Sequence, residues 1–409
     1  MTVYLDHAAT TPVSPGAIEA YLSATTAVGN PSSIHAAGQS AKRILEEARE
    51  QVAATVGCDP IEVVFTSGGT ESINLGIKGL YWQQNENRTR ERIIVPGGEH
   101  HATIDTVEWL ERYEGAVIQW LPLDKDGAVR RDALEGALAE DPGSIALVST
   151  IWANNEVGTV QPIEEIAALT ARAGVPLHID AVSAYGHLPV NFGALRSTAG
   201  NAARGLVALS VSAHKIGGPV GVGALVLSRH ANIVPLIHGG GQQRQVRSGT
   251  QDVAAAVAFA YAAREATDAL DVEPRRLAQL RDHLIAGVRS VVPDAVLNGP
   301  EPASGHRLVS NVHFSFPGCE GDSLLFLLDA AGVAVSTGSA CQAGIPEPSH
   351  VLRAMGRDEA SSRGALRITL GRTSTAADVD AFLSALPAAH AQAAKAGMAD
   401  RSTSIGSAP

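Results

Sequence analysis

The segment that decides the fold is "SIALVSTIWANNEVGTVQPIEEIAALTARAGVPLHID", residues 144–180. It starts with a short apolar run at 144–150 and ends with another at 176–180, and both have the length of buried strands. Between them, residues 163–174 carry apolar side chains at helical spacing. This order of strand, helix and strand predicts two parallel strands joined by a crossover helix.

The same alternation extends over the chain on both sides of this segment. Further apolar runs predict strands at 62–66, 92–96, 205–212 and 221–228, with amphipathic stretches between several of them. An alternation of this kind predicts an α/β fold with a mostly parallel sheet that is covered on both faces. The polar, small-residue stretch 194–205 is expected to be a surface loop.

The pattern changes near residue 252. A long alanine-rich helical region, 252–292, is followed by "NVHFSF", a helical "GDSLLFLLDAAG" and "GALRITLG", which predict a smaller α+β domain. The final "AAKAGMADRSTSIGSAP" is expected to be disordered.

Composition excludes several classes of protein. The formal net charge of -11 over 409 residues has no basic block to offset it, which argues against nucleic-acid binding and anionic membranes. No apolar run reaches the roughly 18 residues of a membrane span, and the N-terminus lacks signal-peptide features. Cys58, Cys319 and Cys341 are far apart, without a CxxC pair. We therefore expect a cytoplasmic protein with no disulfide framework and no metal site.

Lys215 differs from the other four lysines, which lie in amphipathic helical stretches, a turn and the tail. It follows an apolar strand in "SVSAHKIGGPVGVG". It is either a surface turn residue or an amine that binds a cofactor aldehyde such as that of pyridoxal phosphate (PLP). PLP also needs a carboxylate for its ring nitrogen, and N–H groups at a helix N-terminus with hydroxyls for its phosphate.

Candidates for these partners are present, although each has a structural alternative. Asp180 ends the strand 176–180, where a buried carboxylate would need a cation, or it is a turn residue. "FTSGGTES" (65–72) joins a strand to a helix and suits a phosphate or an ordinary cap. Ser212 and His214, beside Lys215, supply two more donors.

Other strand ends carry further candidate side chains. In "GGEHHATIDT", His100 could stack on a flat ring and move protons, or belong to a surface pair with His101. Asn155 follows the strand 144–150, where its amide could reach a ligand oxygen or begin a helix. Arg367 alternates with apolar residues and would bind a substrate carboxylate if buried, or face solvent. Together they form a stronger signal, because ligands bind at the carboxyl ends of parallel strands.

Several motifs together resemble the NifS/IscS-type cysteine desulfurases of the class V aminotransferase superfamily. The resemblance runs from about residue 3 to about residue 390, in the family's order. Around Cys341, "STGSAC" is similar to the NifS and IscS group and differs from the SufS-like group. The motifs that carry the resemblance are "YLDHAATTP", "GNPSSIH", "FTSGGTES", "EHHATIDT", "ANNEVGTVQPI", "HID", "SAHKIGGP", "HGGGQQRQVRSGT", "STGSAC" and "LRITLG".

The resemblance implies fold type I of the PLP-dependent enzymes, the aspartate aminotransferase-like fold, and a role for each matched residue. PLP would be covalently bound at Lys215, its pyridinium nitrogen paired with Asp180 and its ring stacked against His100. Its phosphate would be bound by Gly69, Thr70, Ser212 and His214, and by Thr250 of the other subunit of a homodimer. Asn155 and Arg367, with a contribution from Asn30, would bind the substrate carboxylate. Cys341 would be the nucleophile.

One position departs from the family's pattern. Three residues after Asp180, where the family has a Gln bonded to the cofactor's phenolic oxygen, this chain has Ser183. A shorter hydroxyl leaves that contact to PLP open.

The implied activity is conversion of L-cysteine to L-alanine, with the sulfur transferred to Cys341 as a persulfide. The persulfide would serve a sulfur-acceptor protein of iron–sulfur assembly, tRNA thiolation or DNA modification. Alternatives are a selenocysteine lyase, another class V enzyme or an inert scaffold. The implied organisation is a segment 1–15 that packs with the small domain, a PLP-binding domain 16–262, a small domain 263–390 and a tail 391–409.

Overall fold

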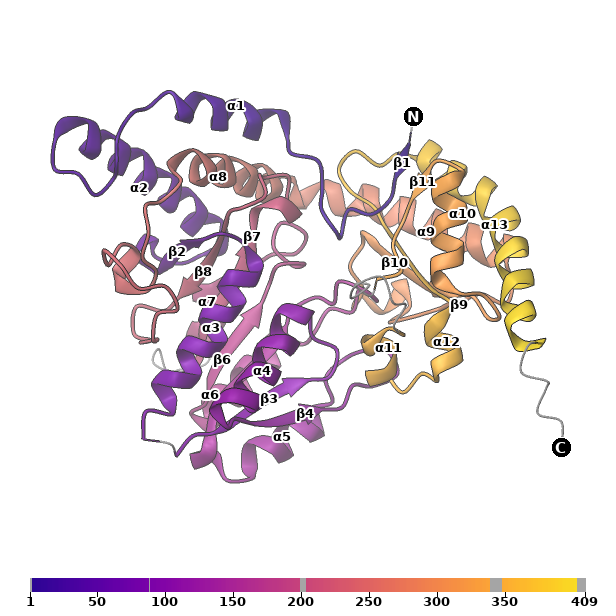
Figure 1. Cartoon of the computed structure of the whole chain (residues 1–409), viewed down its shortest axis with the longest axis horizontal. Helices are drawn as coiled ribbons and strands as arrows, with labels where there is room; N and C mark the ends of the chain where they lie inside the picture. The colour runs from indigo at the N-terminus through magenta and orange to yellow at the C-terminus, as the bar shows by residue number, and fades with distance from the viewer. Residues whose placement is uncertain (1, 88, 199–203, 339–347, 403–409) are drawn as a thin grey trace.

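The larger part of the molecule is built on a seven-stranded sheet, in a computed structural model that describes residues 2–87, 89–198, 204–338 and 348–402 (Figure 1). Its strand order is β2-β8-β7-β6-β5-β3-β4. Pairs among β3 to β7 are parallel, whereas β8 is antiparallel to both β7 and β2. The strands are β2 (Val63–Thr66), β3 (Arg92–Pro96), β4 (Val117–Leu121), β5 (Ile145–Ile151), β6 (Pro176–Asp180), β7 (Gly205–Ser212) and β8 (Gly223–Leu227).

Helices cover both faces of this sheet because successive strand residues point to opposite sides. In β2, Val63 and Phe65 join the core under one helical layer, while Val64 joins the core under the other. One layer contains α3 (Gly69–Gln84) and α4 (His101–Glu114). The other contains α2 (Ala36–Val56), α5 (Arg131–Ala139), α6 (Ile163–Ala173), α7 (Phe192–Thr198) and α8 (Val253–Asp268), with α1 (Pro15–Thr25) against α8.

A second, smaller core lies at the other end of the molecule (Figure 1). Its antiparallel sheet has β10 (Asn311–Ser315) between β9 (Val296–Leu297) and β12 (Ala365–Thr369). The first strand, β1 (Val3–Tyr4), pairs with β11 (Val333–Ala334), and Leu5 is buried in this second core. The helices of this part are α9 (Glu273–Val291), α10 (Gly321–Ala330), α12 (Glu359–Arg363) and α13 (Ala376–Ser402), whereas α11 (His350–Ala354) packs Val351 and Leu352 into the first core.

The predicted fold class is confirmed, but three expectations about segments need correction. The expected loop 194–205 is helical to Thr198, within α7, and Gly205 already belongs to β7. The expected disordered tail from 391 is helical to Ser402, since alanine favours helices and Ala393 is buried in the second core. The region 252–292 breaks between α8 and α9, where the packing changes from the first core to the second.

Strand β4 was not predicted from the sequence. It lies at the sheet edge, and its Val117 and Trp120 side chains are 48% and 42% exposed, which hides the apolar run of a buried strand. Among the described residues, no helix is long and apolar enough to cross a membrane.

Candidate active site

The site is built at the carboxyl ends of β6 and β7 in the large sheet. Asp180 is the last residue of β6 and Ser212 the last of β7, and these two strands are parallel neighbours. Asn155 follows β5, and His100 follows β3. The parallel register therefore brings together side chains that lie far apart in the sequence.

Asp180 is a buried carboxylate. It is 2% exposed, and its Oδ1 accepts a hydrogen bond from Val182 N at 2.9 Å. Burial raises the pKa of Asp180 to about 6, against the opposing effects of that hydrogen bond and of the Lys215 charge. A carboxylate in this position is suited to a cationic partner, because pairing would offset its desolvation.

The N-terminus of α3 lies beside the end of β7, and this place suits a phosphate. Helix α3 begins at Gly69, and a Cβ placed on Gly69 would lie 3.5 Å from Ser212 Cβ and 2.8 Å from Val182 Cγ2. Thr70 follows on the first turn of the helix. Ser212 Oγ is buried and has no hydrogen-bond partner within the described residues. An unpartnered hydroxyl beside a helix N-terminus indicates an anion site.

Lys215 lies in the short turn after β7 and reaches across to the N-terminal segment. Its Nζ donates to the carbonyl oxygens of Ala8 (2.5 Å) and Ala9 (2.9 Å). Burial, followed by the positive charge of Arg367, lowers the pKa of Lys215 to about 8, while Asp6 and Asp180 act in the opposite direction. The amine thus loses its proton more readily than an exposed lysine.

Next to Lys215, His214 Nδ1 lies 3.3 Å from Thr10 Oγ1. Burial, followed by the Lys215 charge, lowers the pKa of His214 to about 4. Its imidazole is neutral at pH 7 and can donate one N–H or accept one.

His100 caps the N-terminus of α4. Its Nδ1 accepts a hydrogen bond from Ala102 N at 3.0 Å, and part of the side chain is open to solvent. The surrounding protein and then the charges of Lys215, His101 and His350 lower the pKa of His100 to about 4. The lowered pKa leaves a neutral ring at pH 7.

Glu99, directly before His100, is a residue that the sequence interpretation missed. Its side chain is fully buried, and Oε1 accepts a hydrogen bond from Ile151 N at 2.9 Å. The Glu99 carbonyl oxygen lies 2.8 Å from His350 Nε2. Burial raises the pKa of Glu99 well above its usual range, and Asp180 adds to this effect. Glu99 thus ties the His100 segment to the end of β5.

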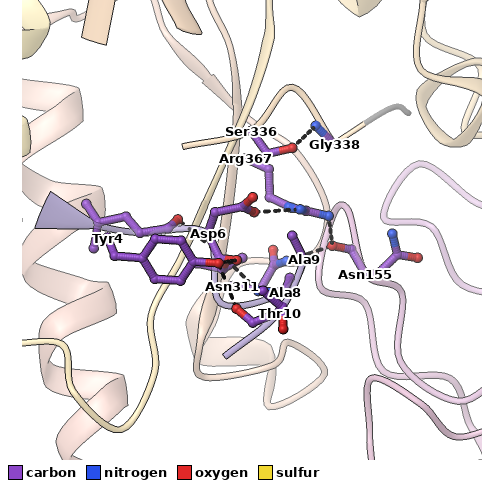
Figure 2. Close-up of polar contacts among 12 residues, drawn as sticks. Tyr4, Asp6, Ala8, Ala9, Thr10, Asn155, Asn311, Ser336, Gly338 and Arg367 are labelled. Carbon is purple, nitrogen blue, oxygen red and sulfur yellow. Dashed lines mark hydrogen bonds and ion pairs between the residues drawn. The ribbon is translucent and has the colours of Figure 1, made fainter. Parts of the chain in front are cut away.

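Arg367 enters the site from the small domain, on β12. It is 5% exposed, so its side chain is buried and does not face solvent. Its Nη2 contacts Asp6 Oδ1 at 2.7 Å, and its Nη1 donates to the backbone oxygen of Asn155 at 3.1 Å (Figure 2). Arg367 Nε is buried and has no hydrogen-bond partner within the described residues.

A cavity connects several of these residues. Asn155, Ser183 and Lys215 line it together with His7 and His187, and it extends between the two cores toward the α8–α9 junction. The structure thereby brings Ser183, the position that departs from the family pattern, close to Lys215.

Two predicted residues lie apart from this site within the chain. Asn30 is exposed in the connection between α1 and α2, where its Oδ1 accepts a hydrogen bond from Ser32 N. Figure 1 shows α1 and α2 on the side of the large domain away from the small domain. The contribution of Asn30 to substrate binding therefore stays a prediction, which contacts within one chain do not test. Thr250 is exposed on the segment that follows the turn at 243–245.

Cys341 lies outside the described residues, but the chain on either side of it is anchored beside Arg367. Ser336 pairs with Arg367 through two backbone hydrogen bonds, of 3.1 Å from Ser336 N and 2.6 Å from Arg367 N. On the far side, Ser349 Oγ donates to Glu156 Oε2 at 2.6 Å, and Glu156 directly follows Asn155. The segment that carries Cys341 thus starts and ends at the site.

The other two cysteines lie in packed surroundings. Cys58 packs against the first core, and burial raises the pKa of its thiol to about 12. Cys319 belongs to the second core, and burial raises the pKa of its thiol to about 11. Neither forms a thiolate readily at neutral pH, which leaves Cys341 as the candidate nucleophile.

Comparison with known proteins identifies the family. The model of the aminotransferase class-V family matches residues 3–382. The chain belongs to the cysteine desulfurases of the aminotransferase class-V family. An "IscS-like cysteine desulfurase" of Mycobacterium tuberculosis is 53% identical to it over 97% of this chain and 98% of that protein. The predicted family and fold class are thereby confirmed.

Solved structures agree with this membership. A "NIFS-LIKE PROTEIN" superposes with a TM-score of 0.84 at 35% identity, covering 95% of this chain and 99% of that one. A structure described as "SspA in complex with cysteine" superposes with a TM-score of 0.74 at 30% identity, covering 90% and 99%.

Members of this family depend on PLP, and the residues of this chain fit that cofactor. The Ser212 hydroxyl without a partner and the start of α3 suit its phosphate, and the buried Asp180 carboxylate suits its ring nitrogen. Lys215, with its lowered pKa, suits the bond to its aldehyde. These residues belong to one corner of the large sheet.

Proposed function

We propose that this chain converts L-cysteine to L-alanine and transfers the sulfur to its own Cys341. The observation that carries the proposal is one cluster of three charged groups, the Asp180 carboxylate, the Lys215 amine and the Arg367 guanidinium. The charge of Lys215 interacts with the charges of the other two groups. Lys215 would bind the aldehyde of PLP, and Asp180 would pair with its ring nitrogen. Its phosphate would be bound by Ser212, Gly69, Thr70 and His214. When bound, PLP supplies an electron sink for the α-carbon of an amino acid.

The residues of the chain then have separate tasks. Arg367 and Asn155 bind the substrate carboxylate; the buried Arg367 Nε donor has no partner within the described residues. His100, neutral at pH 7, covers the ring face and can accept a proton. Lys215 Nζ, with a pKa of about 8, takes the proton from the α-carbon of the substrate and can return it later in the cycle.

The sulfur transfer needs no external oxidant or reductant. The Cβ–S bond of L-cysteine breaks, and a bond forms between that sulfur and Cys341 Sγ. The carbon skeleton takes up a proton and leaves as L-alanine, and the enzyme retains a persulfide. A sulfur-acceptor protein, of iron–sulfur cluster assembly or of tRNA or DNA sulfur modification, then receives the sulfur. We further infer a homodimer in which Thr250 reaches the phosphate bound by the other subunit.

The decisive experiment compares Cys341→Ser with a matched variant, Cys319→Ser. Cys341→Ser is expected to keep the cofactor's absorbance but to lower sulfide release from L-cysteine at least about 100-fold, since the nucleophile is lost. Cys319→Ser is expected to keep the wild-type rate, because Cys319 is a core residue. Mass spectrometry of trapped wild-type enzyme should find one extra sulfur on the peptide with Cys341. Undiminished sulfide release by Cys341→Ser would refute the nucleophile assignment.

A further inference from the structure

The N-terminal segment Tyr4–Thr11 is part of the active site. Tyr4 OH lies within hydrogen-bond distance of the carbonyl oxygens of Asp6 (3.0 Å) and Thr10 (2.8 Å), and its one proton can be donated to either, which closes the segment on itself (Figure 2). Ala8 N donates to Thr369 Oγ1 at 2.9 Å, so that the segment is also fixed to β12. The segment faces Lys215 through two carbonyl oxygens and Arg367 through Asp6.

Asp6 and Arg367 form a partly desolvated ion pair. Their side chains are 19% and 5% exposed, and the Nη2–Oδ1 distance is 2.7 Å. The guanidinium also donates a hydrogen bond from Nη1 to the backbone oxygen of Asn155. The Nε donor is left over, buried and without a partner within the described residues. A ligand carboxylate that used it would share the guanidinium with the Asp6 carboxylate.

The charges around this ion pair disfavour the binding of a second anion. Lys215 interacts with Asp6 and Asp180, and Arg367 pairs with Asp6. Arg372 also lines the cavity, where it already pairs with Glu265 at 3.3 Å. Three histidines nearby add no positive charge at pH 7, because their pKa values are lowered, to about 4 for His100 and to about 3 for His313. The third, His214, is likewise lowered to about 4.

We propose that Asp6 is a specificity-determining residue that neutralises Arg367 and so restricts the substrate site to amino acids with a single carboxylate. This inference rests on the proposed role of Arg367 as the substrate-carboxylate ligand. One carboxylate can share the guanidinium with Asp6, whereas a ligand with two carboxylates brings a further negative charge, and the further cation of the cavity, Arg372, is already paired with Glu265. The repulsion by Asp6 grows with the charge of the ligand. Asp6 therefore favours L-cysteine over acidic amino acids.

The test uses two competing ligands that share a backbone and differ in one carboxylate, L-alanine and L-aspartate. Their inhibition constants against L-cysteine are measured for wild type and for Asp6→Asn, whose amide oxygen can still accept from Arg367. The variant is expected to bind L-aspartate about 10-fold more tightly and L-alanine only about 3-fold more tightly, because the repulsion that is removed scales with ligand charge. An unchanged ratio of the two constants would overturn the proposal.

Two further variants separate this role from others. Tyr4→Phe loosens the segment but leaves the Asp6 carboxylate in place, so that its alanine-to-aspartate ratio should stay at the wild-type value. If Tyr4→Phe changes the ratio as much as Asp6→Asn does, segment order and not charge sets the selectivity, and the proposal is wrong. Arg367→Ala should weaken both ligands. If it weakens neither, the proposed role of Arg367 fails, and the inference about Asp6 fails with it.

Discussion

The two sides of the active site differ in how their charges are balanced. On the side formed by Asp180, Ser212 and Lys215, here called the cofactor side, the carboxylate is buried with a raised pKa and a hydroxyl has no partner within the described residues. On the side formed by Asp6, Asn155 and Arg367, here called the carboxylate side, the cation already has an ion-pair partner and a backbone acceptor. Its buried Nε donor has no partner in the described chain.

This difference corresponds to what each side has to bind. A cofactor that stays bound can supply the missing charges permanently, so the cofactor side gains stability only when it is loaded. A substrate has to enter and a product has to leave in each cycle, so a guanidinium without a counter-ion would hold carboxylates too tightly. The two sides also differ in the domains that form them. The cofactor side comes from the large sheet alone, whereas the carboxylate side combines Asn155, which follows β5 of that sheet, with Asp6, which follows β1, and Arg367 on β12.

The largest effect is expected from Lys215→Ala, which removes the reactive amine of the cofactor side. Sulfide release from L-cysteine should fall by at least about 10³-fold, because proton transfer at the substrate loses its acid–base group. The absorbance of the lysine-bound cofactor should disappear as well. Steady-state assays and absorbance spectra of the purified variant measure both. Retention of the wild-type spectrum would show that another residue binds the cofactor.

Asp180→Asn separates cofactor binding from stability. It should lower cofactor affinity at least about 10-fold, since the ring nitrogen loses its carboxylate, yet stabilise the cofactor-free protein. The folded pKa of about 6 lies above the unfolded value of 3.8, so protonation of Asp180 favours folding at low pH. That contribution is lost as the pH rises through 6.

The variant should therefore be more stable than cofactor-free wild type by roughly 1–3 kcal/mol at pH 7 and nearly equal to it at pH 4. Urea unfolding of the two cofactor-free proteins at both pH values measures this difference. A loss of stability in the variant at pH 7 would mean that Asp180 has a cationic partner even without the cofactor.

The smallest effect is expected from Ser212→Ala. Cofactor affinity should fall roughly 3–10-fold, the net value of one ordinary hydrogen bond, while the melting temperature of the cofactor-free protein should not fall, since Ser212 Oγ has no partner within the described residues. Ser210→Ala is the matched control, because Ser210 Oγ contacts His178 Nε2 at 2.9 Å. It should lower the melting temperature and leave cofactor affinity within about 2-fold. The reverse pattern would refute the assignment of Ser212 to the phosphate.

Much of the cofactor side could be predicted from the sequence. Asp180, Ser212 and Lys215 all stand at or just after the end of an apolar run, and strand periodicity is a local signal. Parallel strands then place their carboxyl ends at one edge, so that these residues had to meet. Strand β4 escaped this reasoning because its side chains at the sheet edge are half exposed.

The carboxylate side could be predicted only in part. Arg367 was recognised by its position among apolar residues, but Asp6 lies 361 residues earlier in the chain, and no local pattern indicates that the two meet. Asn30 belongs to a motif that suggested the site, and its side chain is exposed in the connection between α1 and α2. Its role in substrate binding stays a prediction, because contacts within one chain do not decide it.

The sequence by itself determined the family, the order of strands and helices, and the lysine, carboxylate and hydroxyl at the strand ends. These follow from periodicity and from short motifs, which depend on neighbours in the chain. Only the tertiary structure decided that Asp6 pairs with Arg367, that Lys215 faces the carbonyl oxygens of Ala8 and Ala9, and that Glu99 is buried beside Asp180. Contacts of this kind depend on packing between distant segments, and burial then sets the charge state of each group.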